Sequence, residues 1–287
     1  MIAKSQKHWT GDVAELLRVR EGFVLADVDP QSTPGYEKGK VEAAEDLASG
    51  ATQLDEYQDR LFARSRVDAT HASVLLVLQA MDSAGKGGIV RHVVGSVDPQ
   101  GVSITAFKAP TPEELEHDFL WRVEQRVPEP GFIGVFDRSH YEDVLIGRVR
   151  ELAPPDEIER RYGAINTFEK QLTDAGTRVV KVMLHISSDE QKERLQKRLD
   201  RPDKHWKYNP GDVDERKLWP KYMDAYQQVF ERTSTEHAPW HVVPANRKWY
   251  ARIAVQNLLL EALEQIDPQW PAATFDVEAE KKRLAAT

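Results

Sequence analysis

The amino-acid sequence predicts an α/β fold in which helices cover both faces of a parallel sheet. Stretches with helical spacing separate short apolar runs typical of buried strands, which lie at 73–80, 102–107, 131–136, 178–186 and 240–244. The chain has 287 residues, of which 40% are hydrophobic and 30% charged, as in folded globular proteins. This length fits one domain with insertions as well as two compact domains, and we favour one.

The segment before the first strand is expected to be a helical extension. Asp29-Pro30 and Thr33-Pro34-Gly35 indicate turns. Between Lys40 and Arg66 apolar residues recur at helical spacing, which predicts a long amphipathic helix packed on the main domain. We therefore expect an N-terminal helical extension at 1–70, a main domain at 71–270 and a charged, helix-like tail at 271–287. Within the main domain a helix is expected over 112–127.

Composition excludes several kinds of function. The chain has no cysteine, which rules out disulfides, thiolate metal sites and cysteine nucleophiles. Its formal net charge of -8 argues against general nucleic-acid binding. The first ten residues lack the apolar stretch of a signal peptide, and the longest aliphatic run, Val74 to Leu78, is too short to span a bilayer. We expect a cytoplasmic protein without a membrane partner.

The loop after the first strand has the features of a phosphate-binding loop (P-loop, or Walker A). It runs AMDSAGKG from Ala80 to Gly87 and lies between a predicted strand and a predicted helix, so its backbone N–H groups would point at an anion. The expected phosphate contacts come from Ser83, Ala84, Gly85, Lys86 and Gly87. The usual pattern has glycine at the position of Ala80 and a hydroxyl residue at the position of Gly87. The alternative is a flexible glycine-rich turn that opens a helix.

Two aspartates are candidate magnesium ligands. Asp82 lies inside the loop, where a carboxylate beside phosphates is repelled by about 4 kcal/mol per close charge pair at an effective dielectric constant near 20. A bridging Mg²⁺ would turn that repulsion into attraction. Asp137 ends the third strand, where P-loop enzymes hold a second metal-binding acid. The sequence therefore predicts Mg²⁺, with Mn²⁺ as the alternative ion, between Asp82 and Asp137.

The residues after Asp137 are further candidates. Arg138 could stabilise charge on the transferring phosphoryl group, and the alternative is a surface Asp-Arg pair that contributes about 0–1 kcal/mol. His140 could form a phosphoenzyme. We favour ring packing or a hydrogen bond to the loop for His140, because in-line transfer needs positioning and charge neutralisation more than a covalent relay.

A basic segment follows the fourth strand. Residues 191–207 carry seven cations and three acids in a chain whose overall charge is negative. The spacing of Arg194, Arg198 and Arg201 predicts three guanidinium groups on one helical face, suited to repeated phosphates. With Lys204 and Lys207 they would belong to a lid over about 189–212 that closes on the substrate. The alternative is a solvated helix face with internal ion pairs.

Taken together, these motifs resemble the second polyphosphate kinase family. The similar segments cover nearly the whole chain and are TPGY at Thr33, LVLQAMDSAGKGG, DPQGV, FKAPTPEELEHDFLWR, FDRSHYEDVL, RPDKHWK and APWHVVPANRKWY. Family members usually have Gly at the position of Ala80 and often have Asp at the position of Gly87.

The resemblance implies a thymidylate-kinase-like P-loop fold of three layers with a helical lid, and reversible, magnesium-dependent phosphate transfer between inorganic polyphosphate and nucleotides. It implies that Lys86 and Arg138 act with the two metal-binding aspartates in catalysis. Nucleotide-binding roles are implied for Lys108, Arg122 and Glu142. The run SHYED from Ser139 resembles the subgroup that phosphorylates both AMP and ADP.

Adenine nucleotides are the expected acceptors, with guanine nucleotides as an alternative, and a homo-oligomer is expected. Two other functions stay open at this point. One is an ATP-dependent nucleoside monophosphate kinase on the same fold. The other is a catalytically silent module that binds nucleotide or polyphosphate.

Overall fold

The structure is a computed structural model and describes residues 7–67 and 70–287. The expectation about a signal peptide rests partly on residues 1–6, and the end of the expected extension includes residues 68–69; both segments lie outside the described residues.

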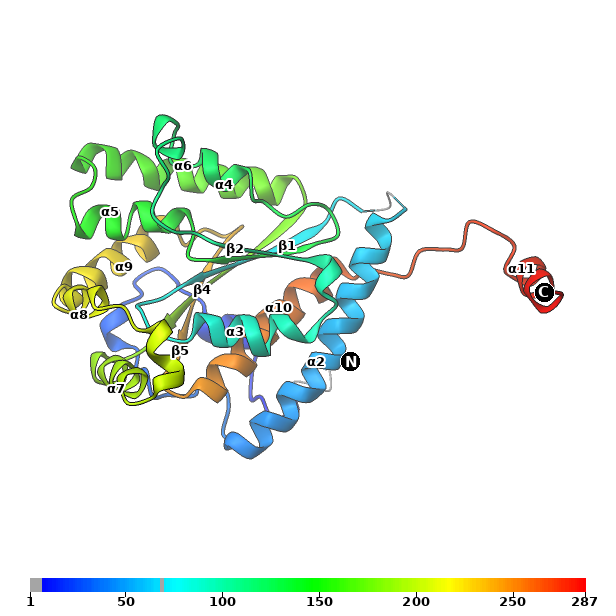
Figure 1. Ribbon diagram of the computed structural model, residues 1–287, viewed down its shortest axis with the longest axis horizontal. Coiled ribbons are helices and arrows are strands. Elements are labelled where there is room, and N and C mark those ends of the chain that lie inside the picture. Colours follow the sequence, from blue (N-terminus) through cyan, green and yellow to red (C-terminus); the bar gives the residue numbers. More distant parts are fainter. Residues whose placement is uncertain (1–6, 68–69) are drawn as a thin grey trace.

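A parallel sheet forms the centre of the molecule (Figure 1). Its order is β2-β3-β1-β4-β5 in the part of the chain that the structure describes. Its strands are β1 (Ser73–Gln79), β2 (Val102–Ala106), β3 (Ile133–Asp137), β4 (Thr177–His185) and β5 (Trp240–Pro244). Every neighbouring pair is parallel, and β1 is buried along its whole length, as expected for an aliphatic strand covered on both faces. The five expected strands are confirmed to within about two residues at each end.

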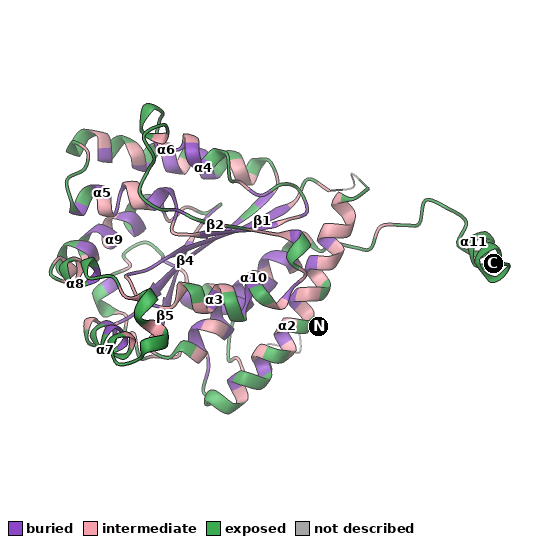
Figure 2. Cartoon of the chain, in the orientation of Figure 1, coloured by how far each residue is buried: buried purple, intermediate pink, exposed green. Residues whose placement is uncertain are grey.

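Two layers of helices cover the sheet, so the three-layer α/β fold is confirmed. One layer contains α2 (Lys40–Ser65), α3 (Lys86–His92) and α10 (Lys248–Ile266). The other contains α4 (Trp121–Glu124), α5 (Ile146–Val149), α6 (Pro155–Asp174) and α9 (Trp219–Thr233). Alternate side chains of β1 enter the two cores, with Val74, Leu76 and Leu78 in the first and Leu75 and Val77 in the second. The strands β1, β3, β4 and β5 are buried along almost their whole length, whereas the residues of β2 at the edge of the sheet are intermediate or exposed (Figure 2).

Shorter elements join these layers. They are α1 (Val13–Leu17), η2 (Leu25–Asp27), η3 (Val94–Ser96), η4 (Pro99–Gly101), η5 (Glu114–Glu116), η6 (His140–Asp143), α7 (Ser188–Leu199), η7 (Pro202–Lys207), α8 (Gly211–Arg216) and α11 (Val277–Ala285).

The expectation of a continuous helix over 112–127 is wrong. Two short turns, η5 and α4, replace it. Between them the Asp118 side chain accepts a hydrogen bond from the Leu120 backbone N–H (3.2 Å), which favours a turn over a continuous helix. The buried Arg122 side chain donates to the carbonyl of Lys108 (2.9 Å), and this bond draws the segment back over the end of β2.

The long helix expected before the first strand is confirmed as α2. Its Leu54 and Leu61 side chains belong to the same core as the sheet. At Gly50 a Cβ atom would lie 2.2 Å from the side-chain oxygen of Gln256, so the missing side chain allows α2 and α10 to approach closely. The extension is thus packed on the main domain as expected, and the boundaries at residues 70 and 270 stay predictions.

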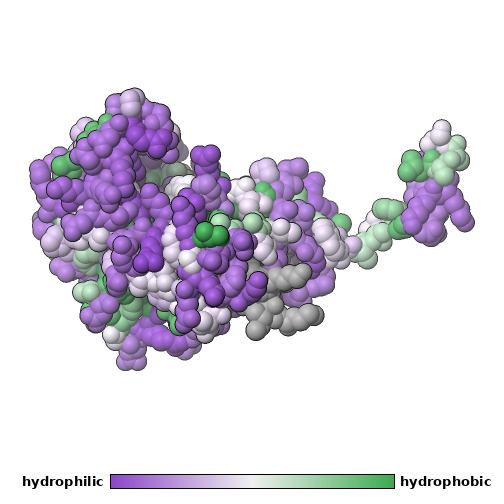
Figure 3. Space-filling view, turned by 90° about the horizontal axis from the view of Figure 1, so that it is seen from below, coloured by the Kyte–Doolittle hydropathy of each residue, from purple (hydrophilic) through white to green (hydrophobic). Residues whose placement is uncertain are grey.

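The chain ends in an arm, residues 267–287, that leads away from the rest of the molecule and carries α11 (Figure 1). None of the residues of α11 is buried. Trp270, Phe275 and Leu284 on this C-terminal arm are 57%, 61% and 75% exposed. In Figure 3, hydrophobic groups are visible along the protruding arm, next to a largely hydrophilic body. No helix among the described residues is long and apolar enough to cross a membrane.

Candidate active site

The loop of residues 80–85 connects β1 to α3, as the sequence predicts. It reverses the chain through Gly85, whose φ of 125° is accessible to glycine and strained for other residues. The N–H of Gly88 donates to the carbonyl of Gly85 (2.7 Å) as α3 begins. The loop therefore opens on a helix N-terminus, which is the local geometry that a phosphate-binding loop requires.

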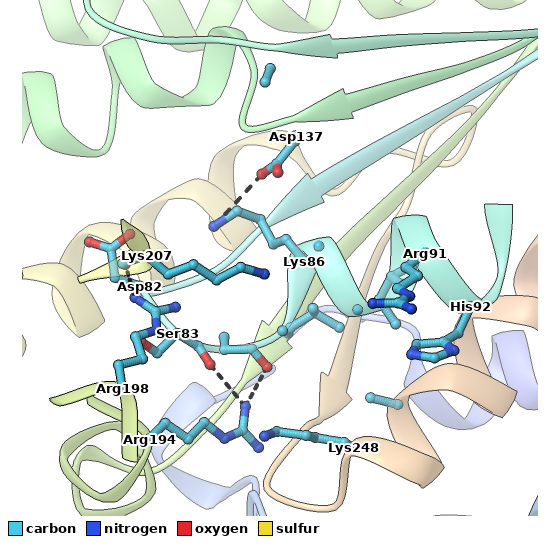
Figure 4. A pocket seen from close by; sticks show the side chains of 18 of the residues that line it. Asp82, Ser83, Lys86, Arg91, His92, Asp137, Arg194, Arg198, Lys207 and Lys248 are labelled. Carbon is cyan, nitrogen blue, oxygen red and sulfur yellow. Dashed lines mark hydrogen bonds and ion pairs between the residues drawn. The ribbon is translucent and has the colours of Figure 1, made fainter. Parts of the chain in front are cut away.

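Lys86 bends back over this loop toward the end of β3 (Figure 4). Its Nζ lies 3.4 Å from the carbonyl oxygen of Ala80 and 4.0 Å from Oδ1 of Asp137. In the sheet, Leu78 of β1 is the register partner of Asp137 of β3, so the two strand ends bring the lysine and the aspartate together. The ammonium group is thereby held beside a carboxylate at the mouth of the loop.

Arg138 pairs with Asp82 across the same edge. Nη2 of Arg138 donates to Oδ1 of Asp82 at 2.9 Å. Arg138 has a φ of 64°, an uncommon left-handed conformation for a residue with a side chain. Burial by itself would lower the pKa of Arg138. The negative charges of Glu142, Asp82 and Asp137 outweigh burial and raise this pKa, so the guanidinium stays a cation.

Asp82 and Asp137 both line one cavity, and their carboxylates can supply some of the oxygen ligands of a hard divalent cation. Mg²⁺ is commonly held by one or two carboxylates together with substrate phosphates and water. Within residues 7–67 and 70–287 no cluster of three or more histidine or acidic side chains could hold a metal by itself. The two aspartates therefore fit an ion that takes its other ligands from substrate and water.

The cavity that opens from the loop has a volume of about 680 Å³ and is strongly basic. Its acidic lining residues in the described chain are Asp82 and Asp137. Its lysines and arginines are Lys86, Arg91, Lys108, Arg138, Arg194, Lys197, Arg198, Arg201, Lys204, Lys207, Lys248 and Arg252. The structure thus brings together the loop and all five cations that the sequence predicts for the lid. A cavity with this charge suits a ligand with many negative charges.

The expected face of three arginines is wrong in one respect. α7 ends at Leu199, so Arg201 lies beyond the helix and has an extended backbone, with φ of −118° and ψ of 109°. Pro202 accounts for this end, because a residue before proline is driven out of the helical conformation. Arg201 instead pairs with Asp203 (2.9 Å), and Arg198 donates to the carbonyl of Lys207 (2.9 Å).

Arg194 differs from the other lid cations because it is buried. Its guanidinium donates to four carbonyl oxygens, those of Ser83 (3.1 Å), Ala84 (2.6 Å), Ala245 (2.7 Å) and Asn246 (3.1 Å). The bonds to Ser83 and Ala84 fix the phosphate-binding loop against α7 (Figure 4), and those to Ala245 and Asn246 fix α7 against the segment after β5. A direct contact of Arg194 with phosphate stays a prediction.

Three cations of this cavity escaped the sequence analysis. Arg91 lies on α3, just beyond the loop, and Lys248 and Arg252 lie one turn apart at the start of α10. Burial and the neighbouring Arg194 lower the pKa of Lys248, which indicates how closely the cations are crowded. The i, i+4 spacing of Lys248 and Arg252 predicts two cations on one helical face, but their distance along the chain from the loop hides that this face lines the same cavity.

A second cavity of about 570 Å³ lies beside the first and shares Asp82 and Arg138 with it. The three residues expected to bind nucleotide, Lys108, Arg122 and Glu142, all line it. Its other walls are partly apolar and include Phe107, Pro110, Leu115, Tyr222 and Tyr226. Burial raises the pKa of the Glu142 carboxyl, against the attraction of Arg138 and Lys86. Such a mixed lining suits a molecule with a flat ring and a charged end.

His140 lines neither of these two cavities. Its ring is fully buried against Tyr141 and Phe168, with centroid distances of 4.6 and 5.5 Å. The expected ring packing is therefore confirmed. Its hydrogen-bonding partner is Glu169 (3.3 Å from Nε2), which the sequence analysis did not identify.

Comparison with known proteins agrees with this geometry. The family model described as Polyphosphate kinase 2 (PPK2) matches residues 42–271. The chain is 46% identical over 249 residues to an AMP/ADP-polyphosphate phosphotransferase of Meiothermus ruber, a match that covers 87% of this chain and 91% of that protein. It is 41% identical to an ADP-polyphosphate phosphotransferase of Rhodopseudomonas palustris over 85% of this chain and 87% of that protein.

A crystal structure of Polyphosphate Kinase 2 from Arthrobacter aurescens TC1 superposes with a TM-score of 0.95 at 59% identity, covering 97% of this chain and 98% of that one. A crystal structure of a putative polyphosphate kinase 2 from Pseudomonas aeruginosa PA01 gives a TM-score of 0.78 at 32% identity and covers 91% of this chain and 52% of that one.

Proposed function

Because the chain belongs to the polyphosphate kinase 2 family, we propose that it moves the terminal phosphate between inorganic polyphosphate and adenine nucleotides, converting AMP to ADP and ADP to ATP in a reversible reaction. The protein is a phosphotransferase of the P-loop kind. The observation that carries the proposal is the meeting of two different cavities at Asp82 and Arg138.

The basic cavity holds the polyphosphate donor. Ten lysines and arginines besides Lys108 and Arg138 line it, and they can neutralise a chain that carries a charge on every phosphate. The partly apolar cavity holds the nucleotide acceptor, with its base against the aromatic and aliphatic wall and its phosphates directed toward Lys108 and Arg122. The reacting ends of the two substrates then meet where the cavities join.

Transfer proceeds by in-line attack of a terminal phosphate oxygen of the nucleotide on the last phosphorus of polyphosphate. The bond between this phosphorus and the bridging oxygen breaks, and the shortened polyphosphate leaves with the electron pair. Lys86 and Arg138 stabilise the charge that spreads over the transferring group. Bound by Asp82 and Asp137, Mg²⁺, or Mn²⁺ as the alternative, would offset the repulsion between the phosphates.

The names of the relatives favour AMP and ADP as acceptors, since the Meiothermus ruber protein is an AMP/ADP-polyphosphate phosphotransferase and the Rhodopseudomonas palustris protein an ADP-polyphosphate phosphotransferase. We extend both acceptors to this chain and keep guanine nucleotides as the alternative. We also propose a cytoplasmic homo-oligomer. The support for assembly is the C-terminal arm, because exposed Trp270, Phe275 and Leu284 would be covered by a second copy.

The experiment is an assay of the purified chain with Mg²⁺, polyphosphate and either AMP or ADP, followed by chromatographic detection of ADP and ATP. Asp137→Asn is compared with Asp174→Asn, a matched change at a surface aspartate that pairs with Lys170. We expect turnover in the wild type and in the Asp174 variant. In the Asp137 variant turnover should fall by about 10³-fold, because its carboxylate is a proposed metal ligand.

Other outcomes identify other functions. Phosphorylation of AMP that requires ATP and ignores polyphosphate would point to a nucleoside monophosphate kinase. Ligand binding with no product in either direction, unchanged in the Asp137 variant, would point to a silent binding module. Absence of product with both acceptors and in the reverse direction refutes the proposal.

A further inference from the structure

A charged pair is buried beneath the active site and takes no part in the proposed reaction. Glu169 of α6 and Lys181 of β4 both have fully buried side chains, and Lys181 Nζ donates to Glu169 Oε2 at 2.6 Å. The same ammonium donates to the carbonyl of Thr233 (2.7 Å) and to the hydroxyl of Tyr141 (2.9 Å). Burying an ion pair costs much of its Coulomb attraction, so such a pair is weak evidence of a stabilising role.

The pair is bonded to the short helix η6, which carries active-site residues. The Tyr141 hydroxyl donates to Glu169 Oε1 (2.7 Å), and His140 Nε2 lies 3.3 Å from the same oxygen. Burial by itself would raise the pKa of Glu169, but Lys181 and His140 outweigh it and lower this pKa, so the carboxylate stays charged. Two successive residues of η6 are thereby anchored to one buried carboxylate.

This anchoring matters because of the residues on either side of it. Arg138 and Glu142 line the acceptor cavity, and Arg138 has the left-handed backbone described above. A strained conformation of this kind persists when the surrounding structure holds it. The Ser139 hydroxyl accepts a hydrogen bond from the Tyr141 N–H (3.2 Å). With its amide oriented so that both ends are satisfied, Gln79 accepts from the Ser139 hydroxyl (3.0 Å) and donates to the Glu142 carboxylate (2.9 Å). These bonds link Tyr141 to Glu142 through Ser139 and Gln79.

We propose that Glu169 and Lys181 are positioning residues, which hold Arg138 and Glu142 in place by anchoring His140 and Tyr141. The proposal rests on the proposed function, since it gives these two residues a part in phosphate transfer. The buried pair touches neither cavity, so it acts through η6 and not on the substrates.

The test is Tyr141→Phe, which removes the anchoring hydroxyl and keeps the ring that packs on Trp240 (centroid distance 4.7 Å). The matched control is Tyr250→Phe, which removes another buried hydroxyl, bonded to the carbonyl of Pro34 (2.8 Å) in the N-terminal segment. We expect Tyr141→Phe to lower kcat by about tenfold to a hundredfold, with the KM for nucleotide changed less than about twofold. Tyr250→Phe should keep kcat within about twofold of wild type.

Making the same substitution in an Arg138→Ala variant separates a positioning role from a general loss of structure. If Tyr141 acts through Arg138, adding Tyr141→Phe to Arg138→Ala should cost little further activity, because the positioned group is already gone. The same addition to Glu142→Gln tests the part played through Glu142. An equal fold-loss in wild type and in both the Arg138→Ala and Glu142→Gln backgrounds, or a kcat like that of the Tyr250 variant, overturns the proposal. The double change Glu169→Gln with Lys181→Met removes the pair without leaving a lone buried charge and should reproduce the loss in kcat.

An NMR measurement distinguishes failure of this inference from failure of the proposed function. The Arg138 side-chain Nε–H resonance, identified by its disappearance in Arg138→Ala, should broaden or move in Tyr141→Phe and stay unchanged in Tyr250→Phe. This readout needs no turnover. A wild type without activity would refute the proposed function alone, whereas an unchanged Arg138 resonance in Tyr141→Phe would refute the positioning role.

Discussion

Replacing Arg138 by alanine should abolish most turnover and leave the fold nearly intact. In the free protein the Arg138 side chain is 40% exposed and that of its partner Asp82 is 28% exposed, so their ion pair contributes about 0–1 kcal/mol to the free energy of unfolding. The backbone strain at Arg138 is much the same with alanine, because both residues have a Cβ atom. In the transition state, an arginine of this kind is worth about 10³–10⁵ in rate, or about 4–7 kcal/mol.

The assay is initial-rate formation of ATP from ADP and polyphosphate, with urea unfolding measured on the same samples. We expect kcat to fall at least about 10³-fold and the free energy of unfolding to change by about 1 kcal/mol or less. Arg138→Lys keeps the positive charge and the strained backbone, so it isolates the planar, two-pronged hydrogen bonding of the guanidinium and should recover part of the rate. A kcat within about tenfold of wild type for the alanine variant would refute a role in charge stabilisation.

Two predictions concern other parts of the chain. Burial lowers the pKa of His185 to about 4, so the imidazole is neutral in the folded protein. The unfolded chain takes up this proton near pH 6.5, so the free energy of unfolding should fall by about 3 kcal/mol as the pH is lowered from 6.5 toward 4. His185→Leu should flatten the dependence of unfolding free energy on pH by that amount, and an unchanged slope would contradict the shift. Removal of residues 270–287 should leave the free energy of unfolding within about 1 kcal/mol, because none of these residues is buried, and should lower the oligomeric state measured by light scattering. An unchanged number of subunits per particle would count against assembly through the C-terminal arm.

The parts of the fold that the sequence predicts well are those set by local pattern. Buried parallel strands are short aliphatic runs, and β1 and β4 stand out against their polar surroundings for this reason. The loop after β1 is predictable because its glycines and Lys86 follow a strand directly. Asp137 is predictable as a site residue because parallel strands end at the same edge of the sheet, where the register places it beside Leu78.

The parts that escaped prediction depend on tertiary contacts. Residues 112–127 have good helix formers, but the bond from the Leu120 N–H to the Asp118 side chain favours a turn between η5 and α4, and the Arg122 bond to the carbonyl of Lys108 holds the segment over β2. Lys181 and Glu169 are charged residue types that are seldom buried, and only the fold shows that they meet inside it. Arg91 and Lys248 reach one cavity from two helices far apart in sequence, so no local spacing reveals the pairing.

The four bonds of Arg194 to carbonyl oxygens divide the predicted lid into a tethered part and a part that is not bonded to the loop. They tie the first two turns of α7 to the loop and to the end of β5, whereas Arg198 and Arg201 beyond them bond within the lid or to α8. If the predicted lid over about 189–212 opens, its pivot would lie after Arg194, because the bonds of Arg198 and Arg201 described here do not reach the loop. We expect the donor chain to be able to slide forward by one phosphate while its cradle stays assembled, which is the mechanical requirement for repeated transfers within one encounter.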